Sequence, residues 1–206
     1  MVLNKVNEKE DYNRLQRRMV TEIEAIQRGI NSRKYLKQNP VARKEANLKD
    51  RKKFLGDVSC KAIQLYLNQI INKTGLEVVG PNVYINGIPN EIDLLIVKSS
   101  SKPIYLTSMY QEEDIISAIE VKTNAKSNDK TVREQLKIFD RIKAFHSRID
   151  CLYVAIYGSN NGCKKIKEEL NKHDYGVFVF ENGNTQVCFT GEFENLINRI
   201  TAYNIN

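Results

Sequence analysis

The chain has few of the residues that build soft-metal or disulfide sites. It contains four cysteines, two histidines and no tryptophan in 206 residues. The cysteines lie far apart without a CxxC pair, and His146 and His173 are too few to complete a ligand set, which argues against a zinc site and a disulfide framework. We expect the cysteines to be small buried hydrophobic residues, with no Cys/His catalytic pair. They are Cys60, Cys151, Cys163 and Cys188.

Long hydrophobic runs are also missing. No stretch approaches the roughly 18 consecutive apolar residues of a membrane span, and the start MVLNKVNEKEDY has no apolar run like that of a signal peptide. We therefore expect a cytoplasmic protein with no membrane partner. The composition, 41% hydrophobic and 28% charged, fits one globular domain plus an appendage.

Positive charge is concentrated at one end. Residues 1–56 hold 15 Lys and Arg against 7 Asp and Glu, whereas the remainder holds 17 against 18. A local basic excess favours binding to a polyanion, because neutralised phosphates release counterions. A solvated, lysine-rich helical face is the alternative. The candidate nucleic-acid contacts are Arg33, Lys34, Arg51, Lys52 and Lys53.

The same 56 residues are predicted to form a basic helical arm. Apolar residues recur at helical spacing over 6–30, Asn39-Pro40 interrupts, and a nearly all-polar helix is predicted over 41–54. Gly56 is expected to end that helix, with Asp57 or Ser59 capping the next. The apolar stripe of the first helix consists of Leu15, Met19, Ile23 and Ile26.

Residues 57–206 are predicted to form an α/β core domain. A helix through KAIQLYLNQIIN ends at Gly75, and three strands follow as a meander: LEVV, VYI and EIDLLIV. A long loop over 99–114 leads to the buried central strand of IISAIEV, and a helix over 129–146 precedes strand CLYVAIY. A helix in KKIKEELNKH, strands GVFVF and QVCF joined through Asn182-Gly183, and a short helix around 196–200 complete the chain. This order predicts a mixed central sheet flanked by helices.

Three charged residues lie within the otherwise apolar strands. NEIDLLIV contains Asp93, and SAIEVKT contains Glu120 and Lys122, which share one face of their strand because side chains alternate. Charges in buried strands need a partner such as a metal ion, although a cross-face salt bridge or a sheet edge is the alternative. Two carboxylates and a backbone carbonyl, that of Val121, suit Mg²⁺, with Mn²⁺ as a substitute. Glu91 shares the face of Asp93 and is a candidate for an outer role.

An acid followed by Glu-x-Lys on neighbouring strands, between two helices, resembles the PD-(D/E)xK nuclease superfamily, over about residues 57–157. The resemblance implies a restriction-endonuclease-like fold in which Asp93 and Glu120 bind magnesium. It implies that Lys122 positions or deprotonates the attacking water. The implied activity is endonucleolytic cleavage of DNA, as in type II restriction and phage-defence nucleases, by a homodimer acting on double-stranded DNA.

The sequence departs from the family pattern at two places. Ile92 stands where the family name has proline, and the helix before the sheet offers no acid apart from Asp57 at its start, with Glu22 and Glu24 on the earlier helix. Gln135 resembles a glutamine that some subfamilies place near the site, or is a solvated helix residue. The alternative functions are a catalytically inactive nuclease-like module that binds nucleic acid and an interaction subunit.

Overall fold

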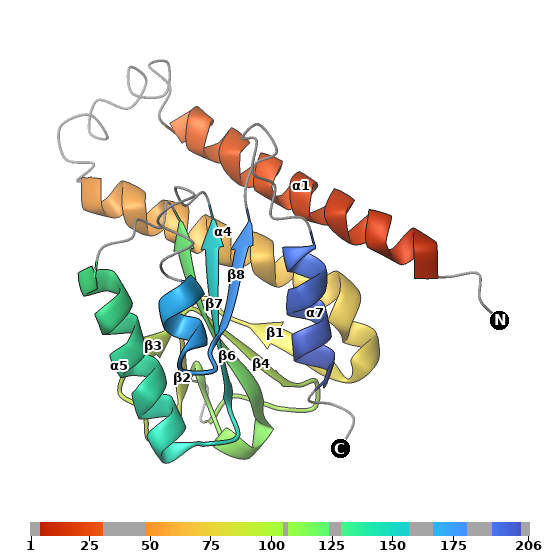
Figure 1. Ribbon diagram of the computed structural model, residues 1–206. Helices are drawn as coiled ribbons and strands as arrows, with labels where there is room; N and C mark the ends of the chain where they lie inside the picture. The colour runs from red at the N-terminus through yellow and green to blue at the C-terminus, as the bar shows by residue number, and fades with distance from the viewer. Residues whose placement is uncertain are drawn as a thin grey trace.

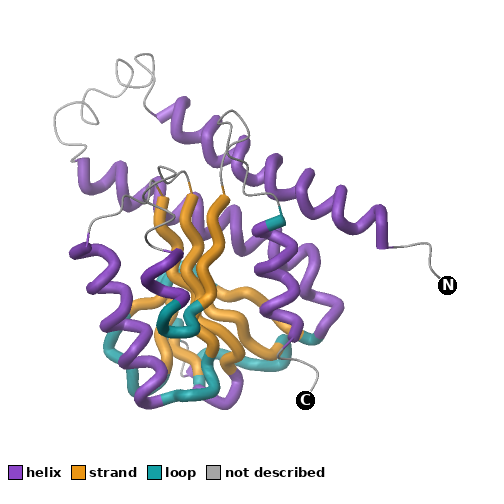
Figure 2. Tube along the Cα trace, viewed as in Figure 1, coloured by secondary structure: helices purple, strands orange, loops and turns teal. Residues whose placement is uncertain are grey.

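The computed structural model describes residues 5–30, 48–104, 107–123, 129–156, 167–180 and 191–202. It is a mixed α/β structure in which helices flank a central sheet (Figures 1 and 2). The predicted α/β class with a mixed sheet is therefore confirmed. The predicted strand QVCF and the turn at Asn182-Gly183 lie outside the described residues, as do Cys163, Cys188, Arg33 and Lys34.

The central sheet has five strands in the order β1-β4-β6-β7-β8. β1, β4 and β6 pair antiparallel, and β6, β7 and β8 pair parallel. β6 is the middle strand and its interior residues are buried, as its continuous apolar sequence predicts. The bounds are β1 Leu76–Val79, β4 Leu94–Lys98, β6 Ile115–Thr123, β7 Asp150–Ile156 and β8 Gly176–Phe180.

Two hydrophobic clusters cover the two faces of this sheet. One joins the strands to α1, α4 and α7, and the other joins them to α5 and a second, smaller sheet. Figure 1 shows α5 and α7 on opposite sides of the strands, with α1 and α4 running across one end. The bounds are α1 Lys5–Ile30, α4 Leu48–Ile71, α5 Asp129–Phe145 and α7 Glu192–Ala202.

The smaller sheet corrects the predicted meander. Its order is β3-β2-β5, with β2 at Val83–Ile85, β3 at Glu91–Ile92 and β5 at Met109–Tyr110. β1 pairs with β4 and not with the next strand, β2. The predicted loop over 99–114 likewise contains β5 and the 3-10 helix η3 at Glu112–Asp114. Short strands of two residues carry too little periodicity to be found in a sequence.

Helix α4 is continuous where the sequence predicts a break. Gly56 and Asp57 lie inside it, so the expected helix end at Gly56 is wrong and the boundary drawn between residues 56 and 57 falls within one helix. A glycine in a helix costs only about 1 kcal/mol, and the buried Cys60, Ile63 and Leu67 on the next turns outweigh that cost. The other predicted end is confirmed, since the 3-10 helix η1 (Asn72–Thr74) closes at Gly75 in a left-handed conformation.

Helix α1 packs into the core instead of standing apart from it. Met19 and Ile23 are fully buried in the cluster shared with α4 and the sheet, and Leu15 packs against that cluster. Ile26, the last member of the predicted stripe, is 41% exposed and does not belong to the core. The cysteine prediction is confirmed at the two described positions, because Cys60 and Cys151 are buried free thiols.

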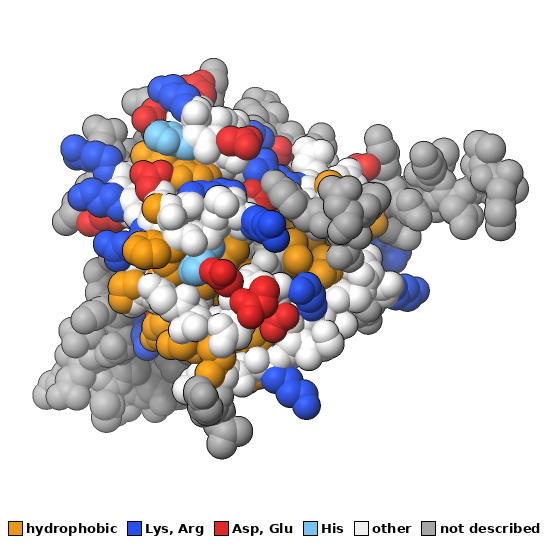
Figure 3. Space-filling model, turned by 90° about the horizontal axis from the view of Figure 1, so that it is seen from below, with side chains coloured by type: hydrophobic (Ala, Val, Ile, Leu, Met, Phe, Trp, Pro, Cys, Tyr) orange, Lys and Arg blue, Asp and Glu red, His pale blue; other side chains and the backbone are white. Residues whose placement is uncertain are grey.

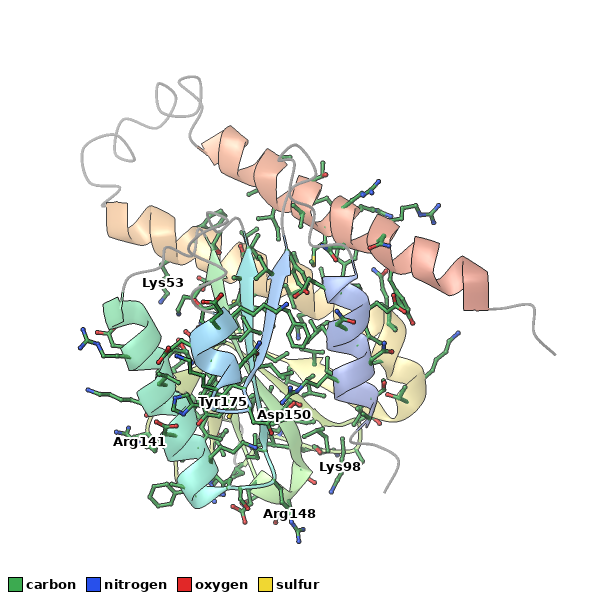
Figure 4. All side chains as sticks on the ribbon, viewed as in Figure 1. Lys53, Lys98, Arg141, Arg148, Asp150 and Tyr175 are labelled. Carbon is green, nitrogen blue, oxygen red and sulfur yellow. The ribbon has the colours of Figure 1, made fainter. Side chains whose placement is uncertain are left out.

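In the described part of the chain no helix is long and apolar enough to cross a membrane. Figure 3 shows the molecule from below, where basic, acidic and hydrophobic side chains are interspersed. Lys98, Arg141 and Arg148 lie in this lower half (Figure 4).

Replacing Gly56 with alanine should stabilise the protein. A Cβ at Gly56 meets no atom within 4 Å, so Gly56→Ala gains about 0.5–1 kcal/mol in the free energy of unfolding, measured by urea denaturation. The matched control is Gly176→Ala, where the added Cβ lies 2.7 Å from Leu152 Cδ2 and should destabilise. A lower unfolding free energy for Gly56→Ala would contradict a regular helix through residue 56.

Candidate active site

Asp93 lies at a break between two strands, and not in the middle of one. The segment NEIDLLIV leaves the small sheet as β3, bends at Asp93 and enters the central sheet as β4. The bend turns the Asp93 side chain toward β6, where the backbone N–H of Val121 donates a hydrogen bond of 2.7 Å to Asp93 Oδ2. The sequence-based position within a single strand is therefore wrong, but the acid still reaches the neighbouring strand.

Glu120 and Lys122 share one face of β6, as strand alternation predicts. The Lys122 ammonium donates to Glu120 Oε1 in a close ion pair. Glu120 has 9% of its side chain exposed and Lys122 has 38%, so the lysine reaches solvent while the acid does not. Ile119 and Val121 point to the opposite face and join the cluster under α4. The structure thus brings the three predicted residues together.

Asp93, Val121 and Lys122 border a pocket of about 370 Å³, and Glu120 is ion-paired with the Lys122 that lines it. Helix α4 forms one wall of it and supplies both Lys53 and Asp57. Thr123 at the end of β6 is tied to that helix, because its hydroxyl donates to Ser59 Oγ at 3.0 Å. The described residues that line it are Lys53, Gly56, Asp57, Cys60, Asn82, Glu91, Asp93, Val121, Lys122 and Thr123.

The two carboxylates disfavour each other's charge. Burial, together with the nearby Asp93, raises the pKa of Glu120 to about 7 against the opposing effect of Lys122. Burial also raises the pKa of Asp93, although Lys122 and the Val121 N–H both favour its charged form. Two buried acids beside one ammonium form a site that additional positive charge would stabilise.

Lys122 remains a cation in this site. Burial lowers the pKa of Lys122, but the Glu120 and Asp93 carboxylates more than offset burial, so its pKa is raised. A reactive thiol has a lowered pKa. The pKa of Cys60 in the pocket wall is instead raised, by burial and by the charges of Asp93 and Glu120.

The remaining candidate residues divide between the pocket and the interior. Glu91 lines the pocket and accepts a hydrogen bond of 3.1 Å from the Tyr84 hydroxyl. Gln135 on α5 is 2% exposed, so it is not a solvated helix residue, and its Nε2 has no hydrogen-bond partner within the described ranges. Arg51 and Lys52 belong to α4, but their side chains are outside the described part of the structure.

The donors fit a hard divalent cation. In the ranges that the structure describes, no three Cys, His, Asp or Glu side chains gather as a metal cluster. Mg²⁺ does not require one, since it usually takes one or two protein carboxylates and completes its shell with water and substrate phosphates. Asp93 and Glu120 supply oxygen ligands of this kind, with the Val121 carbonyl as the predicted third.

Sequence reasoning missed most of the α4 wall. Asp57 was considered as a helix cap and as the one acid that the helix before the sheet offers, and Cys60, Asn82 and Thr123 were not considered as pocket residues. The signal for the wall is the spacing of Lys53, Asp57 and Cys60, which places them on one face of an uninterrupted helix. The predicted break at Gly56 concealed that spacing.

Comparison of the chain with protein-family models, with curated proteins and with solved structures found no significant match. The functional assignment therefore depends on the geometry of the pocket.

The raised pKa of Glu120 predicts a pH-dependent stability in EDTA. The folded protein holds this proton more tightly than the unfolded chain, so the free energy of unfolding should fall as pH rises from about 4.5 to about 7. Glu120→Gln should remove up to about 3 kcal/mol of that fall, measured by urea denaturation across this pH range. The same slope in Glu120→Gln as in the wild type would contradict the raised pKa.

Proposed function

We propose that the protein is a magnesium-dependent endonuclease that hydrolyses DNA phosphodiester bonds, with a PD-(D/E)xK-like site. The observation that carries the proposal is the convergence of three charged residues: Asp93 and Lys122 line one pocket, and Glu120 is paired with Lys122 beside it. The element order supports it, because antiparallel strands bearing the acids precede a helix and a strand parallel to β6. We extend to this chain the restriction-endonuclease-like fold that the sequence resemblance implies.

Each residue has a distinct part in this proposal. Asp93 and Glu120, with the Val121 carbonyl, hold the cation. Mg²⁺, when bound, lowers the pKa of a water molecule and balances the charge that develops on the phosphate. Lys122, partly exposed in the same pocket, orients the attacking water and adds positive charge beside the scissile phosphate. Asp57 adds a further acid from α4 to the pocket lining, outside the pair of carboxylates that would hold the cation.

The nucleic acid would approach the end of the sheet that α4 crosses. Lys53 lines the pocket there and points from α4 toward the side of the strands (Figure 4). Glu91 lines the same pocket and is exposed. The positive charge of Lys53 therefore offsets the negative charge of Glu91 at the rim of the pocket. A homodimer cutting both strands remains part of the proposal and is tested by light scattering of the protein with and without duplex DNA.

Loss of the ammonium or of one acid should abolish cleavage. Lys122→Met and Asp93→Asn should each lower the rate of Mg²⁺-dependent plasmid cleavage by at least about 100-fold, because each removes a group acting on the reacting phosphate. Gel assays with supercoiled plasmid, linear duplex, single-stranded DNA and RNA, in Mg²⁺ and in EDTA, measure the rate. Lys98→Ala is the matched control, since Lys98 is exposed and contacts Glu113 O and Asp114.

The outcome also separates the alternatives. Cleavage by both variants at the wild-type rate would refute the assignment of these residues. Retained DNA binding by the wild type with no cleavage in Mg²⁺ or Mn²⁺ would instead identify a catalytically inactive binding module. Neither binding nor cleavage of any nucleic acid would favour an interaction subunit.

Lys53 should contribute to affinity through phosphate contact. Lys53→Ala should weaken duplex binding in Ca²⁺ and reduce the slope of log affinity against log salt by about 1, because one fewer phosphate is neutralised. Fluorescence anisotropy at several salt concentrations measures this slope. Lys61→Ala is the matched control on the same helix, where Lys61 is exposed and hydrogen-bonded to Gln64. An equal reduction in both variants would show only a general charge effect.

A further inference from the structure

The chain passes between the two sheets twice, once from β1 to β2 and once from β3 to β4. The two passages face each other. Val79 at the end of β1 pairs with Leu95, and Val83 at the start of β2 pairs with Ile92. Between these two pairs, three residues on one segment face two on the other. The facing residues are Gly80, Pro81 and Asn82 on the first crossing and Asp93 and Leu94 on the second. The first crossing is therefore one residue longer than the second.

Gly80 lies against the backbone of Asp93. Its φ is +135°, and a Cβ built there would be 2.6 Å from the Asp93 carbonyl oxygen and 2.8 Å from Leu94 Cδ2. Only glycine tolerates both this backbone conformation and this approach. Asn82, at the other end of the crossing, has a φ of 63° and lines the pocket, so the segment passes directly beside the site.

Asp93 is therefore held on two sides. Its carbonyl is in contact range of Gly80, while its carboxylate accepts the Val121 N–H at 2.7 Å. A side chain at position 80 would have to displace a backbone atom of Asp93, because the carbonyl oxygen cannot rotate away as a flexible side chain does. A shift of the Asp93 backbone would move its carboxylate relative to Val121 and Glu120.

We propose that Gly80 is a positioning residue, which sets the place of the Asp93 carboxylate in the cation site by allowing the two crossing segments to touch. The inference rests on the proposed function for its consequence in metal binding. The structural part of the inference is that residue 80 contacts the Asp93 backbone and thereby sets the hydrogen bond from the Val121 amide to Asp93. This part does not depend on catalysis.

The test is Gly80→Ala, compared with Gly75→Ala. Gly75 also has a positive φ, of 77°, but a Cβ there meets no atom within 4 Å, so the control adds a positive-φ constraint, milder than that at +135°, without the contact. We expect Gly80→Ala to lose about 10–100-fold in Mn²⁺ affinity by calorimetry and in kcat for plasmid cleavage, with KM for DNA unchanged. Gly75→Ala should keep the wild-type Mn²⁺ affinity and kcat.

The Val121 amide reports on the position of the Asp93 carboxylate. Its signal would not change if Gly80→Ala only lowered the stability of the fold. In ¹H–¹⁵N spectra of the metal-free protein, Gly80→Ala should shift the Val121 amide upfield and speed its hydrogen exchange, because its acceptor moves away. The Val154 amide, one strand further on, should remain as in the wild type. An unchanged Val121 amide together with wild-type Mn²⁺ affinity would overturn the inference.

A second variant protects the test against misfolding. Gly80→Ala/Leu94→Ala makes room beside the Leu94 side chain but leaves the contact with the Asp93 carbonyl, and Leu94→Ala alone is its reference. Recovery of Mn²⁺ affinity to the reference value would show that Leu94 packing, and not Asp93, responds to residue 80. If the wild type neither binds Mn²⁺ nor cleaves DNA, the proposed function fails, while the Val121 amide still decides whether Gly80 positions Asp93.

Discussion

The hydrogen bond from the Val121 N–H to Asp93 Oδ2 joins the two parts of the chain on which the pocket depends. Asp93 marks the passage from the small sheet to the central one, and Val121 lies in the middle strand between Glu120 and Lys122. Since the amide holds one carboxylate oxygen, the acid cannot turn toward solvent without leaving a backbone donor unpaired. The same contact brings Asp93 close enough to Glu120 for each acid to influence the ionisation of the other.

Helix α4 completes the pocket because some of its side chains pack in the hydrophobic core while others line the pocket. Ile63, Leu67 and Ile71 pack under the sheet, whereas Lys53 and Asp57, two to three turns earlier, face the pocket. The bond between Thr123 and Ser59 fixes the helix to the end of β6. The position of the α4 side chains relative to the acids is thus determined by hydrophobic packing some distance away from the site.

The sequence was informative where a long periodic pattern coincided with burial. β6 alternates between its two faces over Ile119–Lys122, and α5 follows with Phe139 and Ile142 at helical spacing, so both elements and the shared face of the charged pair could be predicted. Asp93 was harder to place, because its flanking residues are apolar on both sides of the bend and no local signal marks the change of sheet. The helix through Gly56 was also missed, since local propensity favours a break that tertiary packing overrides. The burial of Gln135 depends on how α5 docks on the sheet, which its own spacing does not define.

Cys60 gives the pocket a property that the acids alone would not provide. A thiol must lose its proton before it can ligate zinc or another soft ion, and its surroundings oppose that loss. Among the described residues that line the pocket, Cys60 carries the one sulfur, which is therefore kept in its neutral form beside oxygen donors that suit hard cations. For the proposed site, discrimination against thiophilic metals would then come from the wall contributed by α4, and not from the ligands themselves.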